Sequence, residues 1–125
     1  MKRIIFLFLV LFSFASCKDN LVGTWERQGD ILQGMRVKIN KTETSMYGEI
    51  TQKSTQDGPF SLNETKWKNI KKVGANEYEF EDLNKGYSGH EYAQAHLKID
   101  GDLLTIDMFV NNGSNTNHQL WMRIK

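Results

Sequence analysis

The feature that most limits the fold is a short-range alternation of apolar and polar residues after residue 20. Met35, Val37 and Ile39 alternate with polar residues, and residues 46–51 repeat the pattern. A period of two is typical of β-strands with one buried face. Clusters of Gly, Asn and Asp separate the runs, and this spacing suggests a β-sandwich or a β-barrel.

A first hairpin is expected around Gly74, Ala75 and Asn76, and it would place basic residues opposite acidic ones. The expected pairs are Lys72–Tyr78, Lys71–Glu79, Ile70–Phe80 and Lys68–Asp82. Opposite charges paired across strands contribute a few tenths of a kcal/mol to about one each. We therefore interpret these charged residues first as stabilising the hairpin, and only second as a functional site.

A second hairpin is expected with Asp100 and Gly101 at the centre of a type I′ turn, because glycine tolerates a positive φ. This register pairs Leu97–Leu104, Ala95–Ile106 and Ala93–Met108 on one face, which we predict to be the core face. The other face pairs Tyr92–Phe109, Gln94–Asp107, His96–Thr105 and Lys98–Leu103, and it is mostly polar. Residues 52–61 and 111–117 are polar and are expected to form exposed loops, and a final strand is expected over residues 119–124.

The first sixteen residues have the layout of a signal peptide. Lys2 and Arg3 precede an apolar run, and the small residues Ala15 and Ser16 precede Cys17, the only cysteine. The run is shorter than the roughly 20 residues that span a bilayer, so a permanent transmembrane helix is the weaker interpretation.

Residues 14–17 resemble the lipobox of bacterial lipoproteins. The resemblance implies that residues 1–16 are removed as a signal peptide, that Cys17 receives a diacylglycerol and an acyl chain such as palmitate, and that residues 17–20 form a tether. Several acyl chains hold a protein firmly on a membrane. In Gram-negative lipoproteins an aspartate after the cysteine resembles a retention signal, whereas Lys18 stands here, which favours the outer membrane of the cell envelope. The alternative is ordinary cleavage at Ala15 or Ser16.

Length and charge bound the remaining possibilities. The chain has 125 residues, which supports one domain. Two of the sixteen basic residues lie in the predicted signal, so the mature part has fourteen basic and fifteen acidic residues and a net charge of −1. This balance does not favour binding to nucleic acid by bulk charge. A single cysteine excludes an intramolecular disulfide, and the core alone must stabilise the fold.

Residues 21–125 resemble a lipocalin-like, or calycin, domain. Gly23 and Trp25 match the Gly-x-Trp of the first strand in that family, and Arg123 matches the arginine of the last strand. The resemblance implies an all-β, antiparallel up-and-down barrel of about eight strands, closed by Arg123 stacking on Trp25. Another small β-barrel or a sandwich is the alternative.

Two functions remain open. A lipocalin-like carrier would bind a small apolar ligand, and the residues that could line its site are Trp67, Tyr78, Phe80, Ala93, Ala95, Ile106 and Met108. Alternatively, a filled barrel would serve as an interaction or inhibitor module that contacts an envelope protein. No catalytic motif is present, His90 and His96 are too far apart on one strand to share a metal, and no cofactor is expected, so an enzyme is not predicted.

Overall fold

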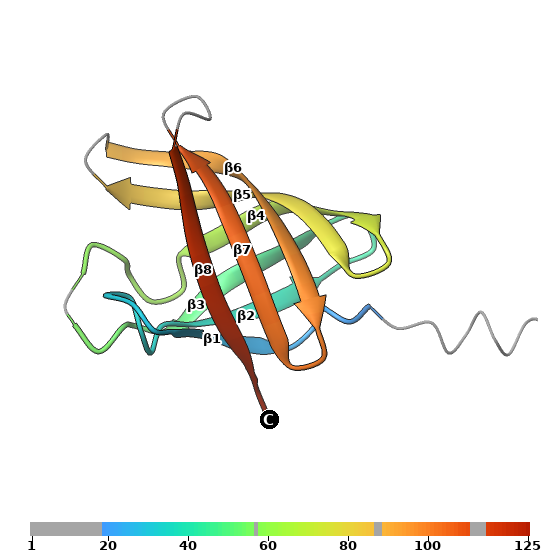
Figure 1. Cartoon of the computed structure of the whole chain (residues 1–125), viewed down its shortest axis with the longest axis horizontal. Helices are drawn as coiled ribbons and strands as arrows, with labels where there is room; N and C mark the ends of the chain where they lie inside the picture. The colour runs from blue at the N-terminus through green and yellow to red at the C-terminus, as the bar shows by residue number, and fades with distance from the viewer. Residues whose placement is uncertain (1–18, 57, 87–88, 111–114) are drawn as a thin grey trace, which may run out of the picture.

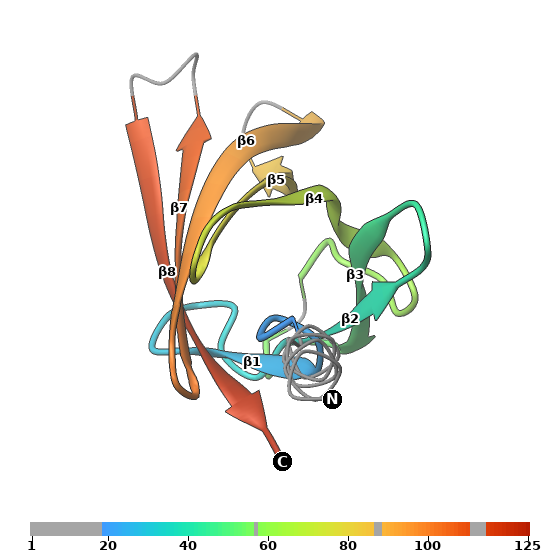
Figure 2. The same cartoon turned by 90° about the vertical axis from the view of Figure 1, so that its right-hand side faces the viewer.

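Eight antiparallel strands form one closed barrel in chain order, with β1 pairing with β8 (Figures 1 and 2). The computed structural model describes residues 19–56, 58–86, 89–110 and 115–125. The predicted all-β, eight-stranded up-and-down barrel is confirmed, whereas the predicted signal peptide and Cys17 lie outside the described residues. The strands are β1 (Thr24–Gln28), β2 (Arg36–Lys41), β3 (Met46–Gln52), β4 (Thr65–Gly74), β5 (Glu77–Gly86), β6 (Gly89–Asp100), β7 (Leu103–Val110) and β8 (Asn115–Ile124).

The up-and-down order gives the barrel two different ends. At the end that we call the open end, β1, β3, β5 and β7 finish. The chain before β1, the β2–β3, β4–β5 and β6–β7 connections and the C-terminus lie at the other end, the closed end. Figure 1 shows the C-terminus beside the β6–β7 hairpin. Residues 19–23, which precede β1, and the open end are therefore on opposite sides of the barrel.

Aromatic side chains fill the barrel interior. Trp25, Trp67 and Trp121 are fully buried. The ring centroid of Trp67 lies 4.9 Å from that of Trp121 and 5.6 Å from that of Phe80, both in edge-on geometry. The buried apolar residues of the described part of the chain lie within residues 21–121, and the barrel closes on itself, so residues 19–125 enclose a hydrophobic core of their own.

The predicted alternation of β2 and β3 builds one wall of this core. Val37 and Ile39 are buried, as are Gly48 and Ile50 on the neighbouring strand. A Cβ on Gly48 would lie 2.7 Å from Cγ1 of Val37 and 3.1 Å from Cε3 of Trp67. Glycine is therefore required there because the core leaves no room for a side chain.

The register of the β4–β5 hairpin differs in part from the prediction. Lys72 pairs with Tyr78 and Lys71 with Glu79, as expected. Beyond a bulge, however, Lys68 pairs with Glu81 rather than with Asp82, and the described register contains no Ile70–Phe80 pair. The cause is Asn69, whose φ of 53° marks an extra residue in β4. This bulge brings Trp67 opposite Asp82.

The β6–β7 register is displaced by two residues from the prediction. The turn is centred on Gly101 and Asp102, and the observed pairs are Ile99–Leu104, Leu97–Ile106, Ala95–Met108, Lys98–Thr105 and His96–Asp107. Only Gly101 of the two turn residues has a positive φ, which is typical of type II′ rather than type I′. An even displacement leaves each side chain on its predicted face, and it adds Ile99 to the core.

The expected exposed loop at 52–61 is confirmed for most of its described residues, but two positions differ. Gln52 belongs to β3, and Phe60 is buried. The Phe60 ring lies beneath two lysine ammonium groups, 4.8 Å from Lys66 Nζ and 5.6 Å from Lys85 Nζ. Burial of an aromatic ring against these cations outweighs the polar character of the surrounding loop. Of the other expected loop, residues 115–117 belong to β8 and residues 111–114 lie outside the described residues.

Candidate ligand-binding cavity

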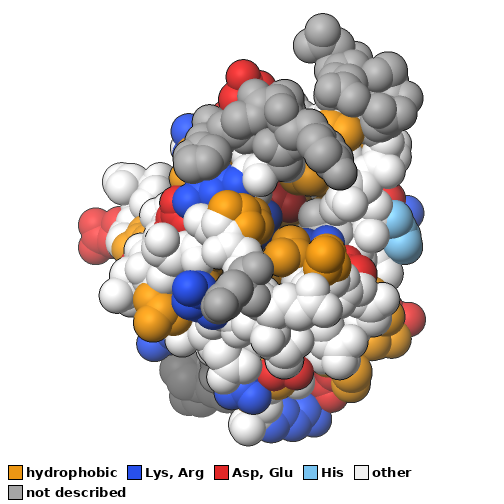
Figure 3. Space-filling view, turned by 90° about the vertical axis from the view of Figure 1, so that its left-hand side faces the viewer, with side chains coloured by type: hydrophobic (Ala, Val, Ile, Leu, Met, Phe, Trp, Pro, Cys, Tyr) orange, Lys and Arg blue, Asp and Glu red, His pale blue; other side chains and the backbone are white. Residues whose placement is uncertain are grey.

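A cavity of about 400 Å³ lies at the open end of the barrel. The β1–β2 and β3–β4 loops and the open ends of several strands surround it. Figure 3 views the molecule from this side and shows apolar and basic side chains next to one another. The apolar part of its lining consists of Ile31, Leu32, Pro59, Phe60, Leu83 and Met108. A cavity of this volume is within the range typical of small-molecule sites.

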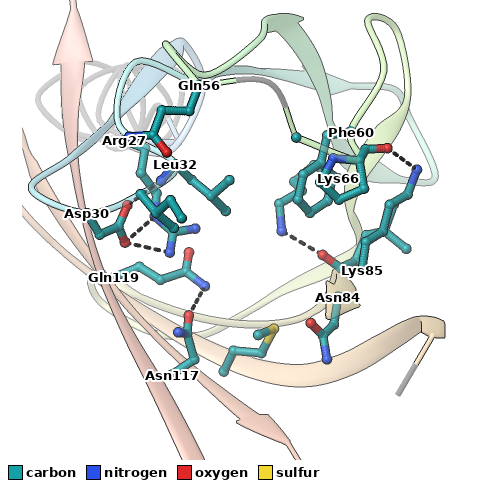
Figure 4. Close-up of a pocket in the computed structure, with 15 residues that line it drawn as sticks. Arg27, Asp30, Leu32, Gln56, Phe60, Lys66, Asn84, Lys85, Asn117 and Gln119 are labelled. Carbon is teal, nitrogen blue, oxygen red and sulfur yellow. Dashed lines mark hydrogen bonds and ion pairs between the residues drawn. The ribbon is translucent and has the colours of Figure 1, made fainter. Parts of the chain in front are cut away.

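The polar part of the lining is concentrated on a few strands. Arg27 comes from β1, Lys66 from β4, Asn84 and Lys85 from β5, and Asn117 and Gln119 from β8, with Asp30 and Gln56 from loops. Figure 4 shows several of these side chains converging on the cavity from different walls. An apolar surface with a small number of convergent polar groups is typical of a ligand site.

A buried ion pair lies in one wall of the cavity. The Lys66 ammonium forms an ion pair with Asp82 and donates a hydrogen bond to the Leu83 carbonyl oxygen at 2.7 Å. Lys66 is 2% exposed and Asp82 is 0% exposed. Burial lowers the pKa of Lys66, and the charge of Arg27 lowers it further, whereas Asp82 opposes this change.

Gln119 connects this ion pair to the core. Its amide nitrogen donates to the second carboxylate oxygen of Asp82 at 3.1 Å and to Oδ1 of Asn117 at 2.8 Å. Its amide oxygen accepts a hydrogen bond from Nε1 of Trp121 at 3.0 Å. The Gln119 amide and the Trp121 Nε1 atom thus find hydrogen-bond partners within this network, which makes their burial tolerable.

The other two cations of the lining have carboxylate partners as well. Arg27 is 3% exposed, and its Nε and Nη2 atoms lie 2.9 and 2.7 Å from Oδ2 of Asp30. Lys85 lies 2.5 Å from Glu64 and donates to the Pro59 carbonyl oxygen at 3.1 Å. These pairs hold the loops at the open end against the strands.

The residues that the sequence predicted as ligand-lining are mostly elsewhere in the barrel. Met108 lines the cavity. Ala93 packs against the core, and the core itself contains Trp67, Tyr78, Phe80, Ala95 and Ile106. Their contact with a ligand stays a prediction.

Sequence reasoning missed the polar residues of the lining, although the strand period carries a signal for two of them. Arg27 follows the buried Trp25 by two positions, and Gln119 precedes the buried Trp121 by two positions. Residues two apart on a strand share a face, so both point inward. Lys66 has no such signal, because it is buried next to Trp67 on the same strand.

Gly23, Trp25 and Arg123 lie together at the closed end. The guanidinium carbon of Arg123 lies 4.3 Å from the centroid of the Trp25 ring. Its Nη1 and Nη2 atoms donate to the carbonyl oxygens of Val22 at 3.0 Å and Asn20 at 2.6 Å. Gly23 has a φ of 140°, and a Cβ there would lie 3.0 Å from Arg123 Nη1. These contacts join the first strand to the last.

The segment before β1 is fixed at this end by Asp19. Its carboxylate accepts hydrogen bonds from the Tyr78 hydroxyl and from the Leu21 backbone N–H at 3.3 Å, and Lys41 lies 3.5 Å away. Burial alone would raise the pKa of Asp19, but these three donors lower it below its usual value. Burial and the neighbouring Asp19 raise the pKa of the Tyr78 hydroxyl.

The described residues contain no cluster of three or more His, Cys, Asp or Glu side chains that could hold a metal ion. His118 Nδ1 lies 2.6 Å from Asp107 on the exposed surface. His96 stands opposite Asp107 on β7 and opposite Glu79 on β5 in the strand register. The His90 side chain lies outside the described residues.

In the described part of the chain, no helix has the length and apolar character needed to cross a bilayer.

Comparison with known proteins supports the architecture. No protein-family model matches the sequence, and neither does any curated protein. Among solved structures, the protein HP1028 from the human pathogen Helicobacter pylori, described as belonging to the lipocalin family, aligns with a TM-score of 0.65. The alignment covers 86% of this chain and 85% of that chain at 13% sequence identity. The fold is lipocalin-like. At this identity the similarity concerns the lipocalin-like fold alone.

Proposed function

We propose that this protein binds a small ligand in the cavity at the open end of its barrel. The observation that carries the proposal is the cavity of about 400 Å³, with apolar walls and convergent polar groups. Trp25, Trp67 and Trp121 are fully buried in the barrel interior and none of them lines the cavity, so the proposed ligand is confined to the open end. Binding is favoured over catalysis because Arg27, Lys66 and Lys85 are held in ion pairs rather than placed as a free acid, base or nucleophile.

The test compares two tryptophan substitutions on the same strand, using residues 19–125. Met108 lines the cavity, whereas Leu103 is an exposed residue of β7. Saturable uptake of medium-chain fatty acids or retinoids is expected for the unaltered protein and for Leu103→Trp, and its loss is expected for Met108→Trp. Circular dichroism of both variants checks that the barrel is retained. Absence of saturable uptake by the unaltered protein, or full uptake by Met108→Trp, would contradict the proposal.

We also propose that lipid on Cys17 anchors the barrel to a membrane. Asp19 is fixed at the closed end, and two residues of chain span at most about 7 Å. An anchor at Cys17 would therefore hold the closed end near the membrane and direct the cavity away from it. Cys17→Ser should abolish incorporation of radiolabelled palmitate, and label that persists on this variant would show that the anchor lies elsewhere.

Lys18 after the cysteine supports delivery to the outer membrane rather than retention on the inner one. Density-gradient fractionation of the full-length protein in a Gram-negative host should place it with outer membranes. Lys18→Asp is the matched variant, and we expect it to move the protein to inner-membrane fractions. An inner-membrane location of the unaltered protein would contradict this assignment.

A second function, contact with an envelope protein, is supported by an apolar strip on the outside of β7 and β8. Leu103 and Met122 are direct partners across these strands, Leu120 lies on the same outer face, and all three are exposed. A photo-crosslinking residue at position 122 should then capture a partner in cells, while one at the exposed Lys72 on β4 should not. Equal crosslinking at both positions would remove the support for this function.

A further inference from the structure

The charged groups that face the cavity are not balanced. Arg27, Lys66 and Lys85 line it, but Asp30 is the only carboxylate in the described lining. The carboxylates that pair with the two lysines, Asp82 and Glu64, are not among the residues that line the cavity. A ligand in the cavity therefore meets three cations and one anion at contact distance, even though the ion pairs make the whole cluster neutral.

Arg27 retains unused hydrogen-bond donors. A guanidinium group has five N–H donors. The Nε and Nη2 atoms of Arg27 face Asp30, whereas its Nη1 atom has no hydrogen-bond partner among the residues that the structure describes. The side chain is 4% exposed, so bulk water does not satisfy these donors freely. Its other contact is the Trp121 ring, 5.6 Å from the guanidinium carbon.

Lys66 presents a second donor from the facing wall. Its ammonium group has three N–H donors, and Asp82 and the Leu83 carbonyl oxygen accept two of them. Figure 4 shows the Arg27 guanidinium and the Lys66 ammonium entering the cavity from opposite sides. The two cations are close enough to repel, because the charge of Arg27 contributes to the lowered pKa of Lys66. An anion between them would remove this repulsion and accept the spare donors.

We infer that the ligand carries an anionic head group, of the carboxylate class, bound between Arg27 and Lys66, with an apolar body against Leu32, Phe60 and Met108. This inference rests on the proposed binding function and specifies its ligand. A cationic head would meet three like charges, and a neutral hydroxyl could accept at most two hydrogen bonds and would carry no charge to attract the three cations. A carboxylate accepts several hydrogen bonds and is bound by arginine in bidentate geometry.

The first experiment varies only the ligand. Octanoate, 1-octanol and octylammonium have equal chain lengths and differ in head-group charge. Their dissociation constants for residues 19–125 are measured at pH 7 by ¹H–¹⁵N chemical-shift titration. We expect octanoate to bind at least about tenfold more tightly than octanol, with octylammonium weakest. Equal affinity of octanoate and octanol, or tighter binding of octylammonium, would overturn the inference while leaving the proposed function intact. Failure of all three to bind would overturn both.

The second experiment varies the protein. Arg27→Gln should reduce octanoate affinity about tenfold and leave octanol affinity nearly unchanged. Arg36→Gln is the matched control, because Arg36 is also an ion-paired arginine, 2.7 Å from Glu26, but it does not line the cavity. A double variant, Lys66→Gln with Asp82→Asn, tests the second cation without leaving a buried charge unpaired. Retention of the octanoate preference in both cavity variants would show that the head group is bound elsewhere.

Discussion

The buried Lys66–Asp82 pair makes the barrel sensitive to removal of either charge. Lys66→Met would leave Asp82 fully buried without its cation. Breaking such a pair typically costs 3 to 5 kcal/mol of unfolding free energy. Because Asp82 keeps its hydrogen bond from Gln119, we expect a loss of about 3 kcal/mol, at the lower end of this range. For a domain of this size the loss corresponds to a melting temperature lower by roughly 12 to 20 °C.

Removal of both charges should be much less harmful than removal of one. In Lys66→Met combined with Asp82→Leu, no buried charge remains, and Gln119 keeps its contact with Asn117. The Leu83 carbonyl oxygen loses its donor, which costs about 1 to 2 kcal/mol. The double variant should therefore unfold within about 2 kcal/mol of the unaltered protein.

Urea unfolding of residues 19–125, followed by tryptophan fluorescence, measures these free energies. Lys98→Met is the matched control, because Lys98 lies 3.4 Å from Glu77 on the surface and its side chain is 65% exposed. The control should lose less than about 1 kcal/mol. If the double variant is as unstable as the sum of the single variants, the two residues are not coupled and the reasoning about the pair is wrong.

Three further predictions concern the closed end and the core. In a double-mutant cycle of Trp25→Ala and Arg123→Ala, urea unfolding should give a coupling of about 0.5 to 3 kcal/mol, and simple additivity would contradict the stacking of Arg123 on Trp25. Gly48→Ala should lower the unfolding free energy by about 1 to 3 kcal/mol, because its Cβ has no space, and an unchanged midpoint would show that the core adapts. Because folding lowers the pKa of Asp19, the ionised Asp19 carboxylate should stabilise the folded state fully above its ordinary pKa of 3.8. This stabilisation should be lost as the pH falls through the lower pKa of Asp19 in the folded protein. Acid titration of stability in Tyr78→Phe should show a smaller loss over this range, and an identical profile would refute the contribution of the Tyr78 hydroxyl.

Local periodicity determined where the strands lie and which residues face inward. The alternation at Met35, Val37 and Ile39 depends only on the two-residue repeat of an extended chain, so it could be recognised without knowledge of any partner strand. The same repeat explains why Ala95 and Leu97 are buried even though the predicted hairpin register was displaced by two. An even displacement changes the partners of a residue but not its face.

The tertiary structure decided the register and the polar content of the cavity. The bulge at Asn69 depends on packing across two strands, and no local sequence pattern predicts it. Lys66 can be buried only because Asp82, 16 residues away, supplies a carboxylate and Gln119, a further 37 residues along the chain, binds the other oxygen. Burial of a charge is favourable only with its partners in place, and closure of the barrel brings these partners together.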